Sequence, residues 1–112
     1  MISSKVKSQS NSMGLSQEDV KCIVDVVSKY PQVEKVLVFG SRAKGIHERG
    51  SDVDLCLKGV ELSSSIVSQI HWTLEEETLL PYFFDVVHYE GIENLELKSH
   101  IDRRGKVVYE RP

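Results

Sequence analysis

The stretch that decides the fold runs from residue 36 to residue 57 and reads VLVFGSRAKGIHERGSDVDLCL. Its first apolar run ends at Gly40-Ser41, and its second opens with Asp52 and Asp54. This order predicts a buried strand, a short basic loop or helical turn, and a returning strand that carries two carboxylates on one face. Such a unit can hold a nucleoside triphosphate and its metal ions, so a nucleotidyl-transferring enzyme or a direct relative is our leading hypothesis.

Length and composition narrow the classes of protein to consider. A chain of 112 residues has room for one domain with one core. Hydrophobic content of 40% and charged content of 28% are ordinary for a water-soluble domain. The net charge of −3 argues against strong nucleic-acid binding by the surface as a whole. Because no signal peptide and no membrane-length apolar run is present, we expect a cytoplasmic protein without a membrane partner.

Apolar periodicity divides the chain into helices and strands, with no repeat or linker. Residues 1–14 are polar and lack an apolar period, so we predict a flexible N-terminal tail followed by a single domain over residues 15–112. A helix is expected after Ser16, where Asp19 completes a capping box, and it should end before Pro31. The other expected elements are strand 34–39, helical turn 41–45, strand 52–57, helix 62–77, strand 82–88, helix 93–104 and an extended piece at 106–110.

Three acidic residues are the candidate catalytic and metal-binding groups. Side chains at positions i and i+2 of a strand share a face, with Cα atoms about 6.5–7 Å apart, so Asp52 and Asp54 can bracket two Mg²⁺ ions about 3.5–4 Å apart. Asp85 lies within FFDVVHY, where an acid among apolar residues is costly unless something compensates it. Adjacent strands lie about 4.8 Å apart, so Asp85 can complete the metal site. We expect it to bind the metal beside an attacking hydroxyl and to help remove the proton.

Five further residues are the candidate ATP-binding groups. Gly40 lets the backbone approach a triphosphate, and Ser41 offers a hydroxyl and an N–H at the start of a helical turn. Arg42 and Lys44 carry the charge to neutralise the β- and γ-phosphates. Ser51, which directly precedes the first of the paired acids, joins this set.

Each of these signals has an ordinary alternative when taken singly. Gly-Ser by itself is a turn, and Asp-x-Asp is usually a solvated strand end. Asp85 by itself fits a satisfied core group or an edge-strand device against aggregation. The joint occurrence of the three signals, in this order and on these local structures, favours the functional interpretation.

Two other kinds of residue invite a functional reading. The histidines lack the spacing of a zinc site and are predicted to be surface or satisfied polar residues: His47, His71, His88 and His100. Trp72 lies about 200° round its helix from Ile70, on the side opposite the expected core stripe. It is either an exposed anchor for a partner or a side chain that a second layer of the protein covers.

Taken together, Gly40-Ser41, ten intervening residues, Asp52-x-Asp54 and the later strand acid Asp85 resemble the signature of the DNA polymerase β-like nucleotidyltransferase superfamily. The local sequence GSRAKG, followed by SDVDL, resembles still more closely that of the minimal nucleotidyltransferases, the MntA-like antitoxins of MNT–HEPN toxin–antitoxin pairs. The resemblance spans nearly the whole domain. It implies an α/β (α+β) fold in which a small mixed sheet of three to four strands is flanked by helices.

The same resemblance implies an activity and partners. It implies Mg²⁺-dependent transfer of AMP from ATP to a tyrosine hydroxyl of a HEPN toxin, an RNase that the modification silences. This chain would then be the antitoxin of a type VII pair, with two Mg²⁺ ions at its site. By the match, Gly40 and Ser41 take the phosphate role, Asp52 and Asp54 the metal role, and Asp85 the role of third carboxylate.

Two alternatives to this reading stay open at the level of sequence. The chain could be an antitoxin that neutralises its partner by occlusion, with a vestigial site. It could also be a nucleotidyltransferase that acts on a small molecule, such as an aminoglycoside, or on an RNA end. The chain has no recognisable acceptor domain, so the last reading needs a homo-oligomer that builds the acceptor pocket between subunits.

Overall fold

The computed structural model describes residues 13–47 and 51–112. Its centre is a four-stranded sheet in the order β3-β2-β1-β4. The strands are β1 (Lys35–Phe39), β2 (Val53–Lys58), β3 (Phe84–His88) and β4 (Lys106–Glu110). β1 is antiparallel to both β2 and β4, whereas β3 is parallel to β2. The mixed sheet that the sequence resemblance implied is therefore confirmed.

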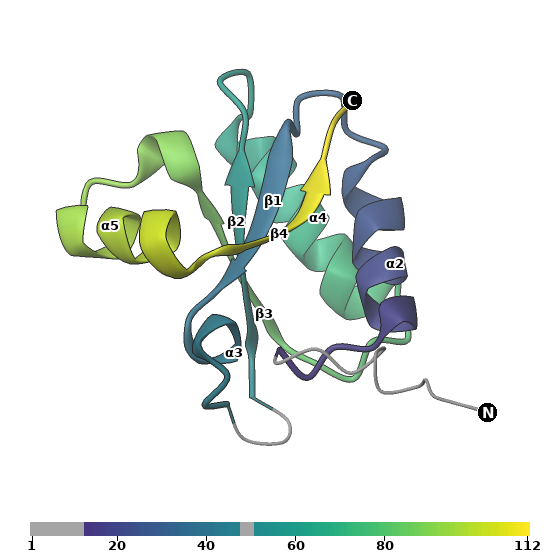
Figure 1. Cartoon of the computed structure of the whole chain (residues 1–112). Helices are drawn as coiled ribbons and strands as arrows, with labels where there is room; N and C mark the ends of the chain where they lie inside the picture. The colour runs from purple at the N-terminus through teal and green to yellow at the C-terminus, as the bar shows by residue number, and fades with distance from the viewer. Residues whose placement is uncertain (1–12, 48–50) are drawn as a thin grey trace.

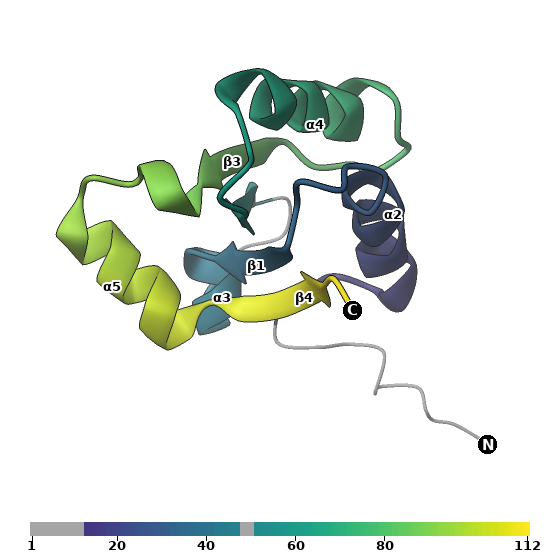
Figure 2. The same ribbon diagram turned by 90° about the horizontal axis from the view of Figure 1, so that it is seen from above.

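Helices cover both faces of this sheet (Figures 1 and 2). α2 (Gln17–Val27) and α4 (Ser64–Glu76) lie on one face, and α5 (Leu95–Arg104) lies on the other. The larger core fills the first face, where Ile23 and Ile70 pack with alternate side chains of β1 and β2. A smaller cluster fills the second face and includes Leu37, Phe39, Cys56 and Ile101. Among the described residues, no helix is both long and apolar enough to span a membrane.

The first helix begins as its sequence predicts. Ser16 is the N-cap of α2, and its hydroxyl accepts the backbone N–H of Asp19, whose carboxylate accepts the N–H of Ser16 in return. Met13, which the sequence placed in the tail, is buried in the core. Residues 1–12 of that tail lie outside the described residues. Met13 is held because its carbonyl and apolar side chain both find partners in the domain.

The other boundaries differ by one or two residues from those expected. β2 begins at Val53, so Asp52 lies directly before the strand rather than in it. α4 begins at Ser64 because the Ser63 hydroxyl accepts the N–H of Ile66 and caps the helix. β3 begins at Phe84. The loop residue Gly50, expected between α3 and β2, lies outside the described residues.

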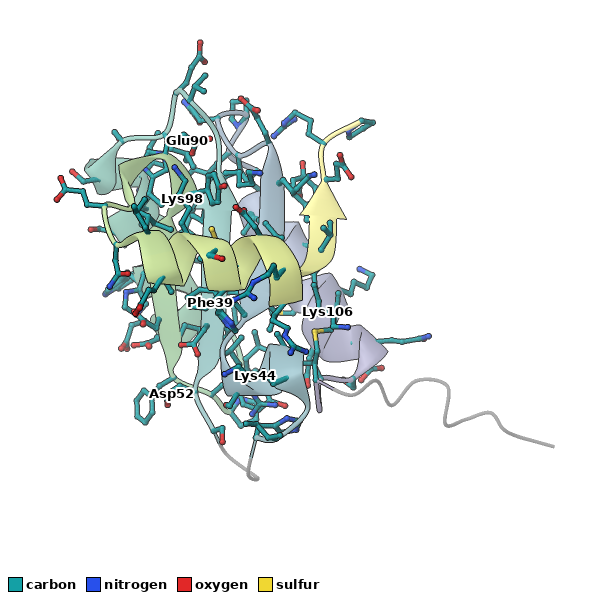
Figure 3. The ribbon with its side chains drawn as sticks, turned by 60° about the vertical axis from the view of Figure 1, so that its left-hand side comes forward. Phe39, Lys44, Asp52, Glu90, Lys98 and Lys106 are labelled. Carbon is teal, nitrogen blue, oxygen red and sulfur yellow. The ribbon has the colours of Figure 1, made fainter. Side chains whose placement is uncertain are left out.

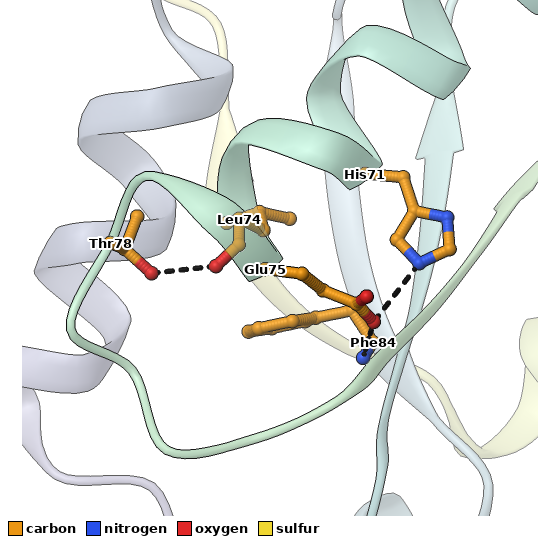
Figure 4. Close-up of polar contacts among 5 residues, drawn as sticks. All are labelled: His71, Leu74, Glu75, Thr78 and Phe84. Carbon is orange, nitrogen blue, oxygen red and sulfur yellow. Dashed lines mark hydrogen bonds and ion pairs between the residues drawn. The ribbon is translucent and has the colours of Figure 1, made fainter.

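A carboxylate joins the end of α4 to the start of β3 (Figure 4). Glu75 accepts the backbone N–H of Phe84 at 2.7 Å, and Nε2 of His71 lies 3.1 Å from the same carboxylate oxygen. One turn further on, the Thr78 hydroxyl donates to the carbonyl of Leu74 at 2.6 Å. These contacts fix where β3 enters the sheet, and thereby where its acid at position 85 lies.

Candidate active site

The strand register brings the three acidic residues together. Asp54 pairs directly with Asp85 across the parallel β2–β3 ladder. Residues two apart in extended backbone point to the same side, so Asp52 projects with them at the beginning of β2. Asp54 is half-buried, whereas the other two are exposed. The predicted adjacency of Asp85 is confirmed, and its catalytic role stays a prediction.

The three carboxylates lie close enough for their negative charges to affect one another. The pKa of Asp54 is raised above its ordinary value, chiefly by burial and then by the negative charges of Asp85 and Asp52. The positive charge of Arg42 offsets part of this rise. Negative charge is therefore in excess at the beginning of β2.

Within the described residues, no three His, Cys, Asp or Glu side chains already form a metal-holding cluster. The donor set nevertheless fits a hard divalent cation such as Mg²⁺, which prefers a few carboxylates together with substrate phosphates. A cation would also offset the repulsion that raises the pKa of Asp54. The residues that would hold it are Asp52, Asp54 and Asp85.

The turn after β1 packs against the central acid. Gly40 has φ 77° and ψ −152°, a conformation that only glycine adopts readily. A Cβ at this position would also collide with Oδ2 of Asp54. Ser41 follows at the first position of α3 (Ser41–Lys44), beside the acid. The turn predicted for phosphate binding therefore adjoins the predicted metal site, and the phosphate roles of Gly40 and Ser41 stay predictions.

His100 is a site residue that the sequence did not reveal. Its Nε2 accepts the backbone N–H of Gly40 at 3.0 Å, and its ring meets Phe39 edge-on at 6.1 Å between centroids. Burial lowers its pKa, and the positive charges of Lys44, Arg104 and Arg103 lower it further. The imidazole is thus held neutral and able to accept this hydrogen bond. No local sequence pattern predicts this contact, because Gly40 and His100 lie 60 residues apart in the chain.

Positive charge gathers beside the acids. Lys44 is exposed on α3, beneath the C-terminal end of α5, where Arg103 and Arg104 lie (Figure 3). All three act electrostatically on His100, so they share its neighbourhood. Lys44 keeps its predicted phosphate role as a prediction. The two arginines join it as cations that sequence reasoning had placed only in a basic C-terminal segment.

The structure contradicts the predicted phosphate role of Arg42. Its side chain is only 2% exposed, and its guanidinium donates to the carbonyls of Met13, Ser51 and Asp52. The same group lies over the ring of Tyr82, 4.9 Å from its centroid. Arg42 therefore binds the backbone of the segment that carries Asp52 and does not bind a phosphate. The carbonyl of Ser51 is part of this clamp, and an ATP contact by Ser51 stays a prediction.

The family model described as polymerase beta, nucleotidyltransferase matches residues 21–112. The chain belongs to this family. No curated protein sequence matches this chain. The fold of this nucleotidyltransferase is shared by several solved structures at low sequence identity.

One similar structure is a toxin–antitoxin complex with AMP-PNP, with a TM-score of 0.70 and 19% identity over 83% of this chain and 74% of that one. A second is a tri-AMPylated Shewanella oneidensis HEPN toxin in complex with MNT antitoxin, with a TM-score of 0.65 and 16% identity over 85% and 72%. A third is a putative nucleotidyltransferase from Sulfolobus solfataricus, with a TM-score of 0.54 and 19% identity over 99% and 91%. These likenesses support the fold of a minimal nucleotidyltransferase.

Replacing Arg42 with lysine should destabilise the nucleotidyltransferase. A lysine keeps the charge but cannot reach both the carbonyl of Met13 and that of Ser51, so buried carbonyls lose their donors. We expect the free energy of unfolding to fall by about 2–4 kcal/mol in denaturant titrations. The exposed Lys44→Ala serves as control and should unfold like the wild type. Unchanged stability of Arg42→Lys with lost ATP binding would restore the phosphate role.

Replacing Asp54 with asparagine should stabilise the metal-free protein. The folded-state pKa of Asp54 is raised from its ordinary value of 3.8, so its ionised form opposes folding. Asp54→Asn should therefore raise the Tm at neutral pH. The gain in Tm should be absent below the ordinary pKa of 3.8. It should grow as the pH rises from there through the raised pKa of the folded protein.

The same pair of proteins tests for a cation site. Adding MgCl₂ should raise the Tm of the wild type and leave that of Asp54→Asn nearly unchanged. Asp25→Asn, which removes an exposed carboxylate on α2, is the matched control and should respond to Mg²⁺ like the wild type. A Tm of Asp54→Asn at or below that of the wild type at neutral pH would contradict the repulsion described above.

Proposed function

We propose that this chain is a Mg²⁺-dependent nucleotidyltransferase that transfers AMP from ATP to a tyrosine hydroxyl of a HEPN-family toxin, and so acts as its antitoxin. The observation that carries the proposal is the register pair Asp54–Asp85, with the Gly40 turn packed against Asp54. Membership of the nucleotidyltransferase family supports the class of reaction. The AMP-PNP and the tri-AMPylated HEPN toxin in the similar complexes support the nucleotide and the acceptor.

In the proposed reaction, the acceptor oxygen forms a bond to the α-phosphorus of ATP while the bond from that phosphorus to the bridging oxygen breaks. Pyrophosphate leaves with the bridging oxygen. Asp85, which is exposed, receives the proton of the entering hydroxyl. When bound, divalent cations would supply charge neutralisation at the entering and leaving oxygens.

The chain's own groups account for how the triphosphate would be placed. The N–H of Gly40 is taken by His100, so this hydrogen bond fixes the shape of the turn. Ser41 offers its hydroxyl and N–H at the start of α3. Lys44, Arg103 and Arg104, which share the neighbourhood of His100, would neutralise the negative charge that accumulates on the leaving pyrophosphate. In this proposal the acids act at the α-phosphate and the cations act at the leaving pyrophosphate.

Transfer of label from α-³²P ATP to a HEPN-family toxin from the same organism tests the proposal. Wild type should label it in the presence of Mg²⁺, and Asp52→Ala and Asp54→Ala should lower the rate by at least about 10³-fold, since each removes a metal-holding carboxylate. Circular dichroism should show that both variants remain folded. Asp25→Ala, which removes a surface carboxylate on α2, should label the toxin at the wild-type rate.

Absence of labelling by the wild type, with the two proteins bound to each other, would overturn the proposal. It would favour the second candidate, an antitoxin that acts by occlusion. One observation favours this candidate specifically: Trp72 is 56% exposed, so no second layer of the described protein covers it. Occlusion predicts that Asp52→Ala still silences the toxin as fully as the wild type does.

A further inference from the structure

Two adjoining hollows lie on the outer side of α4 and of the segment that leads into β3. One has a volume of about 240 Å³ and is lined by Ser68, His71, Trp72, Glu75 and Glu76. The other has a volume of about 240 Å³ and is lined by Glu75, Glu76, Leu80, Pro81, Tyr82 and Phe83. Because both include the same two glutamates, they form one continuous surface, which we call the α4–β3 surface.

Two aromatic rings lie on the α4–β3 surface and face solvent. Trp72 is 56% exposed, and Phe83 is 72% exposed. Single exposed apolar residues are common, but two large rings that border connected hollows resemble the anchors that carry most of the energy of a protein interface. Tryptophan contributes further, because its indole N–H can pair with a partner when the ring is buried.

The surface is held rigid beneath these rings. The carboxylate of Glu75 accepts the N–H of Phe84, so helix and strand cannot slide apart without breaking this hydrogen bond, and His71 on the same helix contacts the carboxylate as well (Figure 4). The hydrogen bond from Phe84 is the main cause that lowers the pKa of Glu75, which therefore stays ionised. A rigid surface loses little conformational entropy when a partner binds.

Its charge selects the partner. Glu75 is ionised, and Glu76 beside it is exposed. A complementary protein must therefore present lysine or arginine next to an apolar side chain that contacts the two rings. A membrane or nucleic-acid surface, which carries negative charge, does not complement it.

The α4–β3 surface is continuous with the acids of the candidate site. The backbone carbonyl of Phe83 accepts the N–H of Val53 at 2.9 Å, so Phe83 lies beside the beginning of β2 and next to Asp52. Phe83 directly precedes β3, the edge strand of the sheet, and comes two residues before Asp85 in the chain. A protein that covers Phe83 thus brings its neighbouring residues to the acids.

We propose that the α4–β3 surface is the docking surface for the acceptor protein, and that the acceptor hydroxyl follows a basic and apolar patch of that protein. The proposal rests on the proposed function, which supplies the acceptor. It adds the surface that chooses this acceptor in a chain whose acidic site is itself open to solvent.

The test compares binding and transfer in one set of variants. The double variant Trp72→Ala/Phe83→Ser should weaken binding to the HEPN-family toxin used in the labelling assay by about tenfold or more, since truncated anchors commonly cost over about 1 kcal/mol each. Its affinity for ATP should equal that of the wild type. Glu76→Lys should slow association and reduce its dependence on salt.

The matched control is Val60→Ser/Leu95→Ser. Both residues are as exposed as the anchors, at 76% and 79%, but lie outside the α4–β3 surface. This control should bind the acceptor protein and transfer label like the wild type. A loss of binding equal to that of Trp72→Ala/Phe83→Ser would show that general surface hydrophobicity, and not this surface, drives association.

The outcomes separate the two proposals. If Trp72→Ala/Phe83→Ser binds as tightly as the wild type, the docking surface is wrong even where Asp52→Ala abolishes transfer. If the double variant loses binding while Asp52→Ala transfers label normally, the docking surface stands and the proposed chemistry fails. If the wild type does not bind the HEPN-family protein at all, both are overturned.

Discussion

The pairing of Asp54 with Asp85 across two parallel strands is the constraint on which the rest of the structure depends. Strand register places these carboxylates side by side, and repulsion together with burial raises the pKa of Asp54. An arrangement that opposes folding survives because the same strands bury Val53, Leu55 and Leu57 completely on the opposite face. Apolar packing on one face of β2 therefore stabilises an unfavourable concentration of charge on the other.

The positive groups around the acids have different tasks. Arg42 is enclosed and holds the chain just before β2 through the carbonyls of Ser51 and Asp52, while a further bond joins it to Met13, so it sets the position of Asp52. Lys44 and the arginines of α5 remain at the surface, where a mobile anion can reach them. One guanidinium is buried and organises the backbone, whereas the other cations are exposed, although the sequence shows only basic residues near a Gly-Ser turn.

Features with a local cause could be predicted from the sequence. The capping box at Ser16 and the alternation of Asp52, Val53 and Asp54 depend on residues within one turn or one strand. Features that depend on the direction of a side chain could not. Arg42 follows Gly-Ser, as a phosphate ligand would, but the carbonyl of Met13 and the ring of Tyr82 draw it inward. The hydrogen bond from Gly40 to His100 joins segments that have no sequence pattern in common, and packing between distant segments likewise buries Met13, which the sequence placed in the tail.

The hydrogen bond between Gly40 and His100 affects how the protein folds during its synthesis. β1 is paired on one side by β2 and on the other by β4, the last strand of the chain. While the polypeptide emerges from the ribosome, β1 lacks its second neighbour and the Gly40 turn lacks its imidazole until α5 and β4 have been synthesised. The nascent chain thus exposes an apolar strand edge until β4 has been made, and the Gly40 turn takes its final shape only after α5 has followed.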